Sequence, residues 1–200
     1  MKKIVLASRN HGKIQEIQAI LSGESIVISS LLDYADIPEV VEDGSTFVEN
    51  ALKKARSTAI TTGEIALADD SGLEVEYLNG EPGIYSARYA GPEQNDRLNI
   101  EKLLKKLDGI PFERRNAAFR CILVLYRPDG SYETFEGKWR GVIYDRPLGE
   151  GGFGYDPVFY LPELEVTVAQ LQSDEKNRMS HRASAVAKLK EYIKTHPDLS

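Results

Sequence analysis

Apolar residues follow two periods along this chain, that of buried strands and that of amphipathic helices. The β-branched and apolar run Lys3–Ser8 predicts a buried strand. Asn10 then suits a helix N-cap, and the apolar residues that follow keep helical spacing as far as Leu21. A second short strand is expected over Ile26–Ser29, and the polar, acidic segment Asp33–Gly44 predicts a loop.

The next segment repeats this order of helix and strand. Thr46-x-x-Glu49 resembles a capping box and predicts a helix that ends near Thr62. Ile65–Ala68 indicates another buried strand, which we expect to end abruptly at Asp69-Asp70-Ser71-Gly72. The alternation in Glu74–Leu78 predicts a further strand.

The second half of the chain combines a helix, a hairpin and a glycine-rich loop. The helix is predicted over about Gln94–Leu107, and a Pro-Asp-Gly turn between Ala117–Tyr126 and Ser131–Arg140 is a strong hairpin signal. Gly149–Pro157 predicts a loop, and Ser180 is expected to cap a final helix after a charged stretch.

Alternating strands and helices followed by an antiparallel hairpin predict an α/β fold with a mixed β-sheet and flanking helices. The 200 residues suit a single domain of two lobes. The middle of the chain, about residues 75–145, is expected to form much of the second lobe. A substrate cleft is expected between the lobes, since ligands favour such positions.

Composition narrows the function classes. Hydrophobic residues make up 42% of the chain and charged residues 28%, as in an ordinary soluble globular protein. A net charge of −6 disfavours a nucleic acid polymer as partner, although a small pocket can still be basic. No apolar run reaches the roughly 20 residues that span a bilayer. Cys121 is the only cysteine, so no intrachain disulfide forms, and we expect a cytoplasmic protein without membrane contact.

Four segments carry candidate chemistry, and the first is Ser8-Arg9-Asn10-His11-Gly12-Lys13. It lies at a predicted strand-to-helix turn, where backbone N–H groups and the helix dipole favour an anion. Lys13 falls in the first helical turn, an unfavourable place for a cation unless an anion lies opposite. A phosphate site is one interpretation, and an ordinary surface lysine is the other.

The second segment contains adjacent acids, Asp69 and Asp70, after a buried strand. Neighbouring residues of a strand point to opposite faces, so one carboxylate is expected to face any given site. Carboxylate oxygens are ligands that Mg²⁺ prefers, and Glu42 in the acidic loop is a further candidate ligand. The alternative is an Asp-rich turn that closes the strand.

The remaining two segments lie late in the chain. Gly151–Pro157 sets aromatic residues among glycines, and such a ring can stack on a nucleobase for roughly 1–3 kcal/mol, or simply pack in the core. Lys176, Ser180, His181 and Arg182 gather before or at the start of the last helix, where cations are again unusual. They suit hydrogen bonds to a carbonyl, or else form a solvated basic patch.

Taken in order, these segments resemble the Ham1/ITPase family of inosine triphosphate pyrophosphatases. The one departure is Ser8-Arg9, where many relatives have Thr-Gly, but Asn10 and Lys13 remain. The matching segments span almost the whole chain and are Leu6-Ala7-Ser8-Arg9-Asn10-His11-Gly12-Lys13, Thr46-Phe47-Val48-Glu49-Asn50-Ala51, Ala68-Asp69-Asp70-Ser71-Gly72-Leu73, Pro82-Gly83-Ile84-Tyr85-Ser86-Ala87-Arg88-Tyr89, Gly152-Phe153-Gly154-Tyr155-Asp156-Pro157 and Ser180-His181-Arg182.

The resemblance implies a homodimer that hydrolyses ITP, dITP and XTP to the monophosphate and pyrophosphate. It implies Mg²⁺ held by Glu42 and Asp70, with Asp70 as the base that activates water and Asp69 beside it. The substrate-binding residues that it implies are Ser8, Arg9, Asn10, His11, Gly12, Lys13, Lys54, Ser71, Phe153, Gly154, Tyr155, Asp156, Lys176, His181 and Arg182.

Two other functions stay open from the sequence. One is a related pyrophosphatase that acts on another nucleotide, against which the Phe153 loop and Ser180-His181-Arg182 argue. The other is a nucleotide-binding sensor without hydrolysis, which would have little use for a water-activating acid.

Overall fold

The computed structural model describes residues 2–24, 26–34, 37–196 and 199. Chain contacts divide the protein into two compact units. Unit 1 comprises Met1–Asp70, Cys121–Gly137 and His181–Ser200, and unit 2 comprises Ser71–Arg120 and Lys138–Ser180. Each unit has its own apolar core, so each is described separately.

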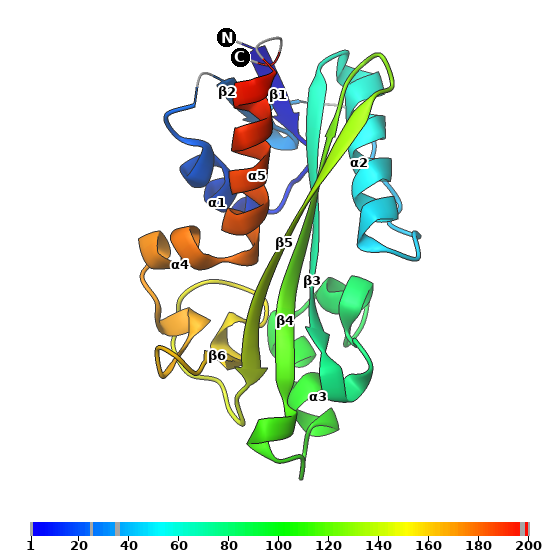
Figure 1. The fold of residues 1–200 in the computed structure, drawn as a ribbon. Coiled ribbons are helices and arrows are strands. Elements are labelled where there is room, and N and C mark those ends of the chain that lie inside the picture. Colours follow the sequence, from blue (N-terminus) through cyan, green and yellow to red (C-terminus); the bar gives the residue numbers. More distant parts are fainter. Residues whose placement is uncertain (1, 25, 35–36, 197–198, 200) are drawn as a thin grey trace. The chain divides into compact units, whose positions relative to one another are not determined.

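The described strands form a seven-stranded sheet in the order β2-β1-β3-β4-β5-β6-β7 (Figure 1). β1 pairs in parallel with β2 and β3, whereas β6 pairs antiparallel with β5 and β7. The predicted α/β fold with a mixed sheet and flanking helices is therefore confirmed. The strands are β1 (Lys2–Leu6), β2 (Ile26–Ser30), β3 (Ile65–Val75), β4 (Asn116–Tyr126), β5 (Tyr132–Ile143), β6 (Phe159–Leu161) and β7 (Val166–Thr167).

The α-helices and several short 3₁₀ segments connect these strands. The α-helices are α1 (His11–Leu21), α2 (Phe47–Thr62), α3 (Asp96–Lys106), α4 (Ser173–Met179) and α5 (His181–Thr195). The 3₁₀ segments are Leu31–Asp33, Glu76–Leu78, Gly83–Arg88, Phe112–Arg114, Asp156–Val158 and Val168–Gln170.

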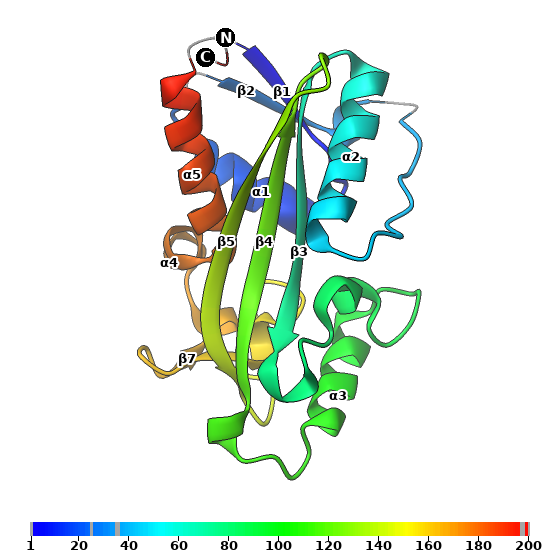
Figure 2. The ribbon, with the colours of Figure 1, turned by 45° about the vertical axis from the view of Figure 1, so that its right-hand side comes forward.

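In unit 1, helices cover both faces of the strands (Figures 1 and 2). Alternate strand residues, such as Ile4, Leu67 and Leu123, join one core cluster with the apolar faces of α1 and α5. The intervening strand residues, such as Ala66 and Ala68, are also buried but lie outside that cluster, and α2 buries its own small apolar face. The period of two along the strands thus separates an α1–α5 face from an α2 face.

Unit 2 has a second core, built from the other ends of the long strands together with α3 and β6. Leu73 on β3, Leu103 on α3 and Phe159 on β6 are fully buried in it. The Phe119 and Phe159 rings pack with centroids 4.3 Å apart. This core supports the glycine-rich loop that ends at Asp156–Val158.

The helix starts follow the local sequence closely. The Asn10 side chain accepts a hydrogen bond from the Lys13 amide at 3.0 Å and so caps α1, as predicted. Thr46 likewise caps α2, because its hydroxyl accepts from the Glu49 amide at 3.1 Å, and the Glu49 side chain accepts from the Ser45 amide at 2.7 Å. α2 ends at Thr62, before Gly63 in the left-handed region.

The strand predictions around the paired acids were wrong. β3 does not end at Ala68 but runs without a break through Asp69 and Asp70 to Val75, and Glu76–Leu78 is a 3₁₀ turn instead of a strand. Buried carboxylates inside a strand are costly unless charged partners compensate them. Those partners come from distant parts of the chain, so the local pattern could not show them.

Candidate active site

Asp69 and Asp70 sit next to each other on β3 and point to different faces. Asp69 contacts Lys13 from α1 and Arg182 from α5, whereas the Asp70 side chain contacts Lys54 from α2. Because side chains alternate along a strand, the two carboxylates serve separate groups of partners. The predicted alternation of the two side chains is therefore observed.

The Asp69 carboxylate is buried and surrounded by donors. Its Oδ1 forms an ion pair with Lys13, and its Oδ2 accepts from Arg182 Nε at 3.0 Å and from Cys121 Sγ at 3.2 Å. Burial by itself would raise the pKa of Asp69, but the charges of Arg182 and Lys13 outweigh it and hold that pKa well below its ordinary value. Asp69 is therefore a fixed, ionised group.

Arg182 is fully buried between two carboxylates. In addition to Asp69, its guanidinium forms an ion pair with Glu16, on the same helix as Lys13. Burial would lower the pKa of Arg182, yet Asp69 and Glu16 raise it above the ordinary value. The four charges of Lys13, Asp69, Arg182 and Glu16 sum to zero, which explains how α1, β3 and α5 can share a buried ionic cluster.

Asp70 has a different environment on the α2 face. Lys54 Nζ lies 3.2 Å from Asp70 Oδ1, 3.2 Å from Glu42 Oε1 and 2.8 Å from the Asp69 main-chain oxygen. Among the described residues, Asp70 Oδ2 is buried without a hydrogen-bond partner. A buried acceptor left in this way is uncommon and costs free energy unless another group completes it.

The pKa values of Asp70 and Lys54 show how burial and neighbouring charges act on this group. Burial raises the pKa of the Asp70 carboxyl, and Lys54 and Lys13 only partly oppose that shift. For Lys54, burial would lower the pKa, but Asp70 and Glu42 raise it, so the side chain stays an ammonium ion. The Asp70 and Glu42 carboxylates thus share the buried ammonium of Lys54.

The donor set of Glu42 and Asp70 fits a hard divalent cation. No group of three or more His, Cys, Asp or Glu side chains suited to a metal occurs among the residues that the structure describes. Mg²⁺ needs no such cage, because it commonly takes one or two protein carboxylates and completes its shell with water and phosphate oxygens. The unpartnered Asp70 Oδ2 is an oxygen that such an ion would satisfy.

The turn between β1 and α1 presents polar groups at the start of a helix. Ser8 Oγ accepts from the Asn10 amide at 3.2 Å, and Arg9 Nη2 donates to the Ile37 carbonyl at 2.6 Å. His11 and Gly12 are the first residues of α1, so their amides have no partner within the helix. This is the backbone arrangement expected of an anion site, and Lys13 adds a charge that is now paired with Asp69.

In unit 2, the glycine-rich loop is organised around the buried Asp156. Its Oδ2 accepts from Lys176 Nζ at 2.5 Å and from the Phe153 amide at 2.9 Å. A Cβ on Gly152 would lie only 2.0 Å from that same oxygen, and Gly152 has a φ of 72°, so this position requires glycine. Lys176 Nζ lies 4.5 Å from the centroid of the half-buried Phe153 ring.

The other predicted site residues of unit 2 lie in positions that indicate no particular contact with a ligand. Tyr155 lies in the core, where its hydroxyl donates to the Ser86 carbonyl at 2.9 Å, so core packing describes this aromatic residue. The Gly154 amide donates to Asp96 at 2.7 Å. Ser71 follows Asp70 on β3 and is half-buried.

The residues at the start of α5 are buried. His181 and Arg182 are its first two residues, as the sequence predicts, and neither is a solvated basic side chain. Ser180 is buried and lies between α4 and α5 in the chain. The solvated-patch alternative is therefore wrong for these three residues.

Sequence reasoning missed Glu16, Cys121 and Asp96 as partners of candidate site residues. Glu16 carried a usable signal, because it lies three residues after Lys13 on one helix and so shares its face. Cys121 and Asp96 carried none, since they reach Asp69 and Gly154 only through the fold.

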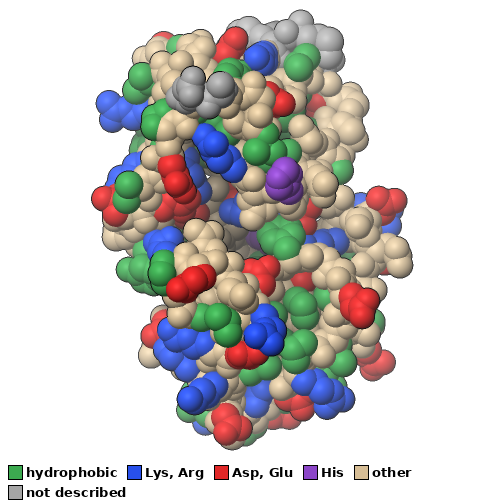
Figure 3. Space-filling model, turned by 180° about the vertical axis from the view of Figure 1, so that it is seen from behind, with side chains coloured by type: hydrophobic (Ala, Val, Ile, Leu, Met, Phe, Trp, Pro, Cys, Tyr) green, Lys and Arg blue, Asp and Glu red, His purple; other side chains and the backbone are tan. Residues whose placement is uncertain are grey.

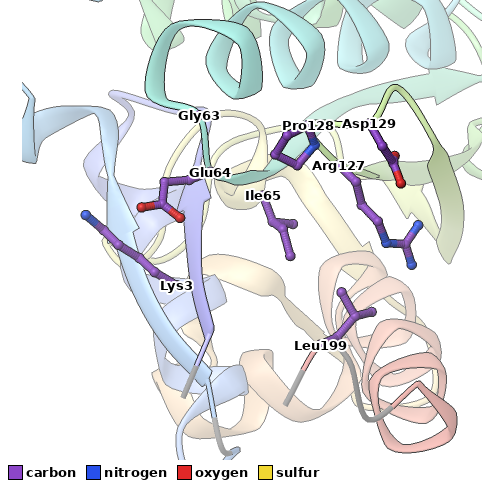
Figure 4. Close-up of a pocket in the computed structure, with 8 residues that line it drawn as sticks. All are labelled: Lys3, Gly63, Glu64, Ile65, Arg127, Pro128, Asp129 and Leu199. Carbon is purple, nitrogen blue, oxygen red and sulfur yellow. The ribbon is translucent and has the colours of Figure 1, made fainter.

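Two surface features do not compete with these groups. On the face shown in Figure 3, basic and acidic side chains are interspersed. Within unit 1, a cavity of about 490 Å³ has Lys3 and Glu64 on one side and Arg127 and Asp129 on another, but no predicted site residue lines it (Figure 4). No helix among the described residues has the length and apolar character to cross a bilayer.

Comparisons with known proteins agree along nearly the whole chain. Residues 4–192 match the Ham1 family. A Geobacter sulfurreducens protein named dITP/XTP pyrophosphatase is 52% identical over 193 residues, covering 96% of this chain and 97% of that protein. A HAM1 protein from Coxiella burnetii aligns with a TM-score of 0.89 at 41% identity, covering 98% of this chain and 100% of that one. The Ham1 protein of Staphylococcus aureus gives 0.87 at 44% identity, covering 97% and 99%.

Proposed function

This chain belongs to the Ham1 family, and from that premise we propose that it is a pyrophosphatase acting on non-standard purine nucleotides. It hydrolyses ITP, dITP and XTP to the nucleoside monophosphate and pyrophosphate. Relatives named dITP/XTP pyrophosphatase support the substrate class. The observation that carries the chemistry is the buried Asp70 Oδ2, which is unpartnered among the described residues and lies on the carboxylate that shares Lys54 with Glu42.

In the proposed reaction, Asp70 is the general base. A water oxygen attacks the α-phosphorus while the water proton passes to the Asp70 carboxylate. The bond from the α-phosphorus to the bridging oxygen breaks, and pyrophosphate leaves with that electron pair. Asp70 is suited to this role by its position, because its carboxylate shares Lys54 with Glu42 at the proposed metal site. Asp69 stays ionised beside it and holds Lys13 and Arg182 in place.

Glu42 and Asp70 are the residues that would hold Mg²⁺. Bound there, the ion would supply Lewis-acid stabilisation of the negative charge on the phosphates. The chain itself contributes Lys54 and Lys13 as further cations for the triphosphate. Ser8, Arg9, Asn10, His11 and Gly12 offer hydroxyl, side-chain and amide donors at the helix start.

Purine selection is assigned to a second set of residues. The Phe153 ring is the proposed stacking surface for the base. His181 and Arg182 are proposed donors to a carbonyl at C6, which would leave the donor amino group of adenine without an acceptor. Asp156 and Lys176 hold the Phe153 loop through the bonds described above and are proposed base-edge contacts, with Gly154 and Ser71 proposed to line the substrate.

A homodimer and a cytoplasmic location belong to the same proposal. The family resemblance implies the dimer, and an enzyme that removes faulty nucleotides acts where the nucleotide pool is used. Light scattering of the purified chain tests the dimer directly.

A substrate panel with and without a chelator tests the proposed function. We expect pyrophosphate release from ITP and XTP to be far faster than from ATP, GTP or dTTP, and to vanish when EDTA removes divalent cations. Equal rates on all nucleotides would contradict the specificity. Tight nucleotide binding with no pyrophosphate release would instead indicate a sensor.

A further inference from the structure

Lys54 forms ion pairs with Glu42 and Asp70, the two carboxylates that the proposed function assigns to the metal ion. Its Nζ is 3.2 Å from an oxygen of each, and the Asp69 carbonyl holds it from a third direction at 2.8 Å. The Lys54 side chain is only 13% exposed, so water screens this charge poorly. The ammonium is therefore an internal counter-ion for Glu42 and Asp70.

The charges around this group disfavour a free divalent cation. Glu42, Asp70 and Lys54 together carry one net negative charge, and adding a divalent cation would give these three groups and the ion one net positive charge. Lys54 would then lie within a few ångströms of the added ion and repel it. Asp70 Oδ2 still offers an oxygen, so the cation is opposed by charge and not by lack of a ligand.

A nucleoside triphosphate changes this balance. Its phosphate oxygens bring the negative charge that both cations need, and the flexible lysine stem lets the ammonium turn from the carboxylates to a phosphate oxygen. The same lysine then opposes the cation when it comes alone and supports the cation when it comes with nucleotide.

We propose that Lys54 couples metal binding to nucleotide binding: it competes with the free divalent cation for Glu42 and Asp70, and releases them when the cation arrives with a triphosphate. The inference rests on the proposed function for the identity of the nucleotide. The competition between Lys54 and the cation does not depend on the proposed function, because it involves only the chain and the ion.

The test measures binding of Mn²⁺ alone to the full-length chain, by titration with electron paramagnetic resonance detection. Lys54→Met removes the charge and keeps a flexible apolar stem. We expect it to bind free Mn²⁺ about tenfold more tightly than the wild type, because the variant lacks the positive charge of Lys54 that repels the ion. Lys54→Arg keeps the charge and should bind free Mn²⁺ as the wild type does.

A neighbouring lysine gives the matched control. Lys53 lies on the same helix as Lys54 and pairs with the exposed Asp43, and its own side chain is 45% exposed, so water screens its charge and Lys53→Met should leave Mn²⁺ affinity unchanged. Circular dichroism checks that each variant folds. If Lys54→Met does not fold, Lys54→Gln takes its place.

The second half of the test adds a non-hydrolysable analogue of ITP. Here the order should reverse, and the wild type should bind the Mn²⁺–nucleotide complex more tightly than Lys54→Met. Equal or weaker binding of free Mn²⁺ by the uncharged variants would overturn the coupling. Failure of the proposed function would appear separately, as wild-type protein that releases no pyrophosphate from ITP.

Discussion

The two faces of β3 each carry an aspartate, and the two aspartates differ in how fully charged or hydrogen-bonding partners surround them. On the α1–α5 face, Asp69 has Lys13, Arg182 and Cys121 as donors. On the α2 face, Asp70 shares the single ammonium of Lys54 with Glu42 and keeps one buried oxygen without a partner among the described residues. A completed carboxylate stabilises the fold, whereas an uncompleted one is available for chemistry. We therefore expect Asp69 to serve mainly the structure and Asp70 the reaction.

The sharpest way to break this comparison is Asp70→Asn. The amide cannot accept the proton from water, so we expect pyrophosphate release from ITP to fall about 10²–10⁴-fold, the usual contribution of a general base. Nucleotide binding should survive, and thermal unfolding should occur near the wild-type temperature. Turnover close to that of the wild type would exclude Asp70 as the base.

Asp69→Asn should act on stability first. It leaves Lys13 and Arg182 buried with one fewer carboxylate, and breaking a buried ion pair costs about 3–5 kcal/mol of unfolding free energy. Urea denaturation measures this loss as a lower midpoint. Asp43→Asn breaks an exposed pair with Lys53 and is the control, with no measurable change expected. A stable Asp69→Asn protein that lacks activity would remove the distinction between the two acids.

A smaller loss of unfolding free energy is expected from Gly137→Ala on β5. A Cβ there would lie 1.9 Å from the His181 carbonyl oxygen and 2.6 Å from the Ala185 amide nitrogen, both of which are backbone atoms of α5. The first turn of α5 must shift, with Arg182 on it, at a cost of about 1–3 kcal/mol.

The matched control for that change is Gly91→Ala, whose added Cβ meets only the flexible Glu93 side chain. Denaturant midpoints of the two variants give the difference. Mn²⁺ binding at Glu42 and Asp70 should persist in Gly137→Ala, because the lysine that pairs with both carboxylates, Lys54, lies on α2. Loss of metal binding there would show that the two faces of β3 are not independent.

The local sequence was enough to predict the elements whose signals are local. Asn10 and Thr46 cap helices because a short polar side chain reaches an amide three residues ahead, which needs no tertiary structure. The apolar periods of α1 and α5 likewise identified their buried faces. The proposal of a site beside Asp69 and Asp70 followed from two acids after an apolar strand.

What could not be predicted depends on distant partners. β3 continues through the acids because Lys13 and Arg182, 56 and 113 positions away, neutralise Asp69. The seven residues of α4 have no apolar period, so the sequence predicts only a charged stretch there. In the structure, however, its Lys176 is buried against Asp156. The burial of Arg182 between Asp69 and Glu16 was equally hidden, so its proposed contact with the base stays a prediction.

The pleat of β3 has a practical consequence for anyone who varies this protein. Asp69 and Asp70 are chemically identical, so only their parity along the strand tells them apart. Adding or deleting one residue between Ile65 and Ala68 would rotate each onto the other's side and exchange their neighbours, without altering any functional group. A mutational library that covers this stretch should therefore hold its length constant.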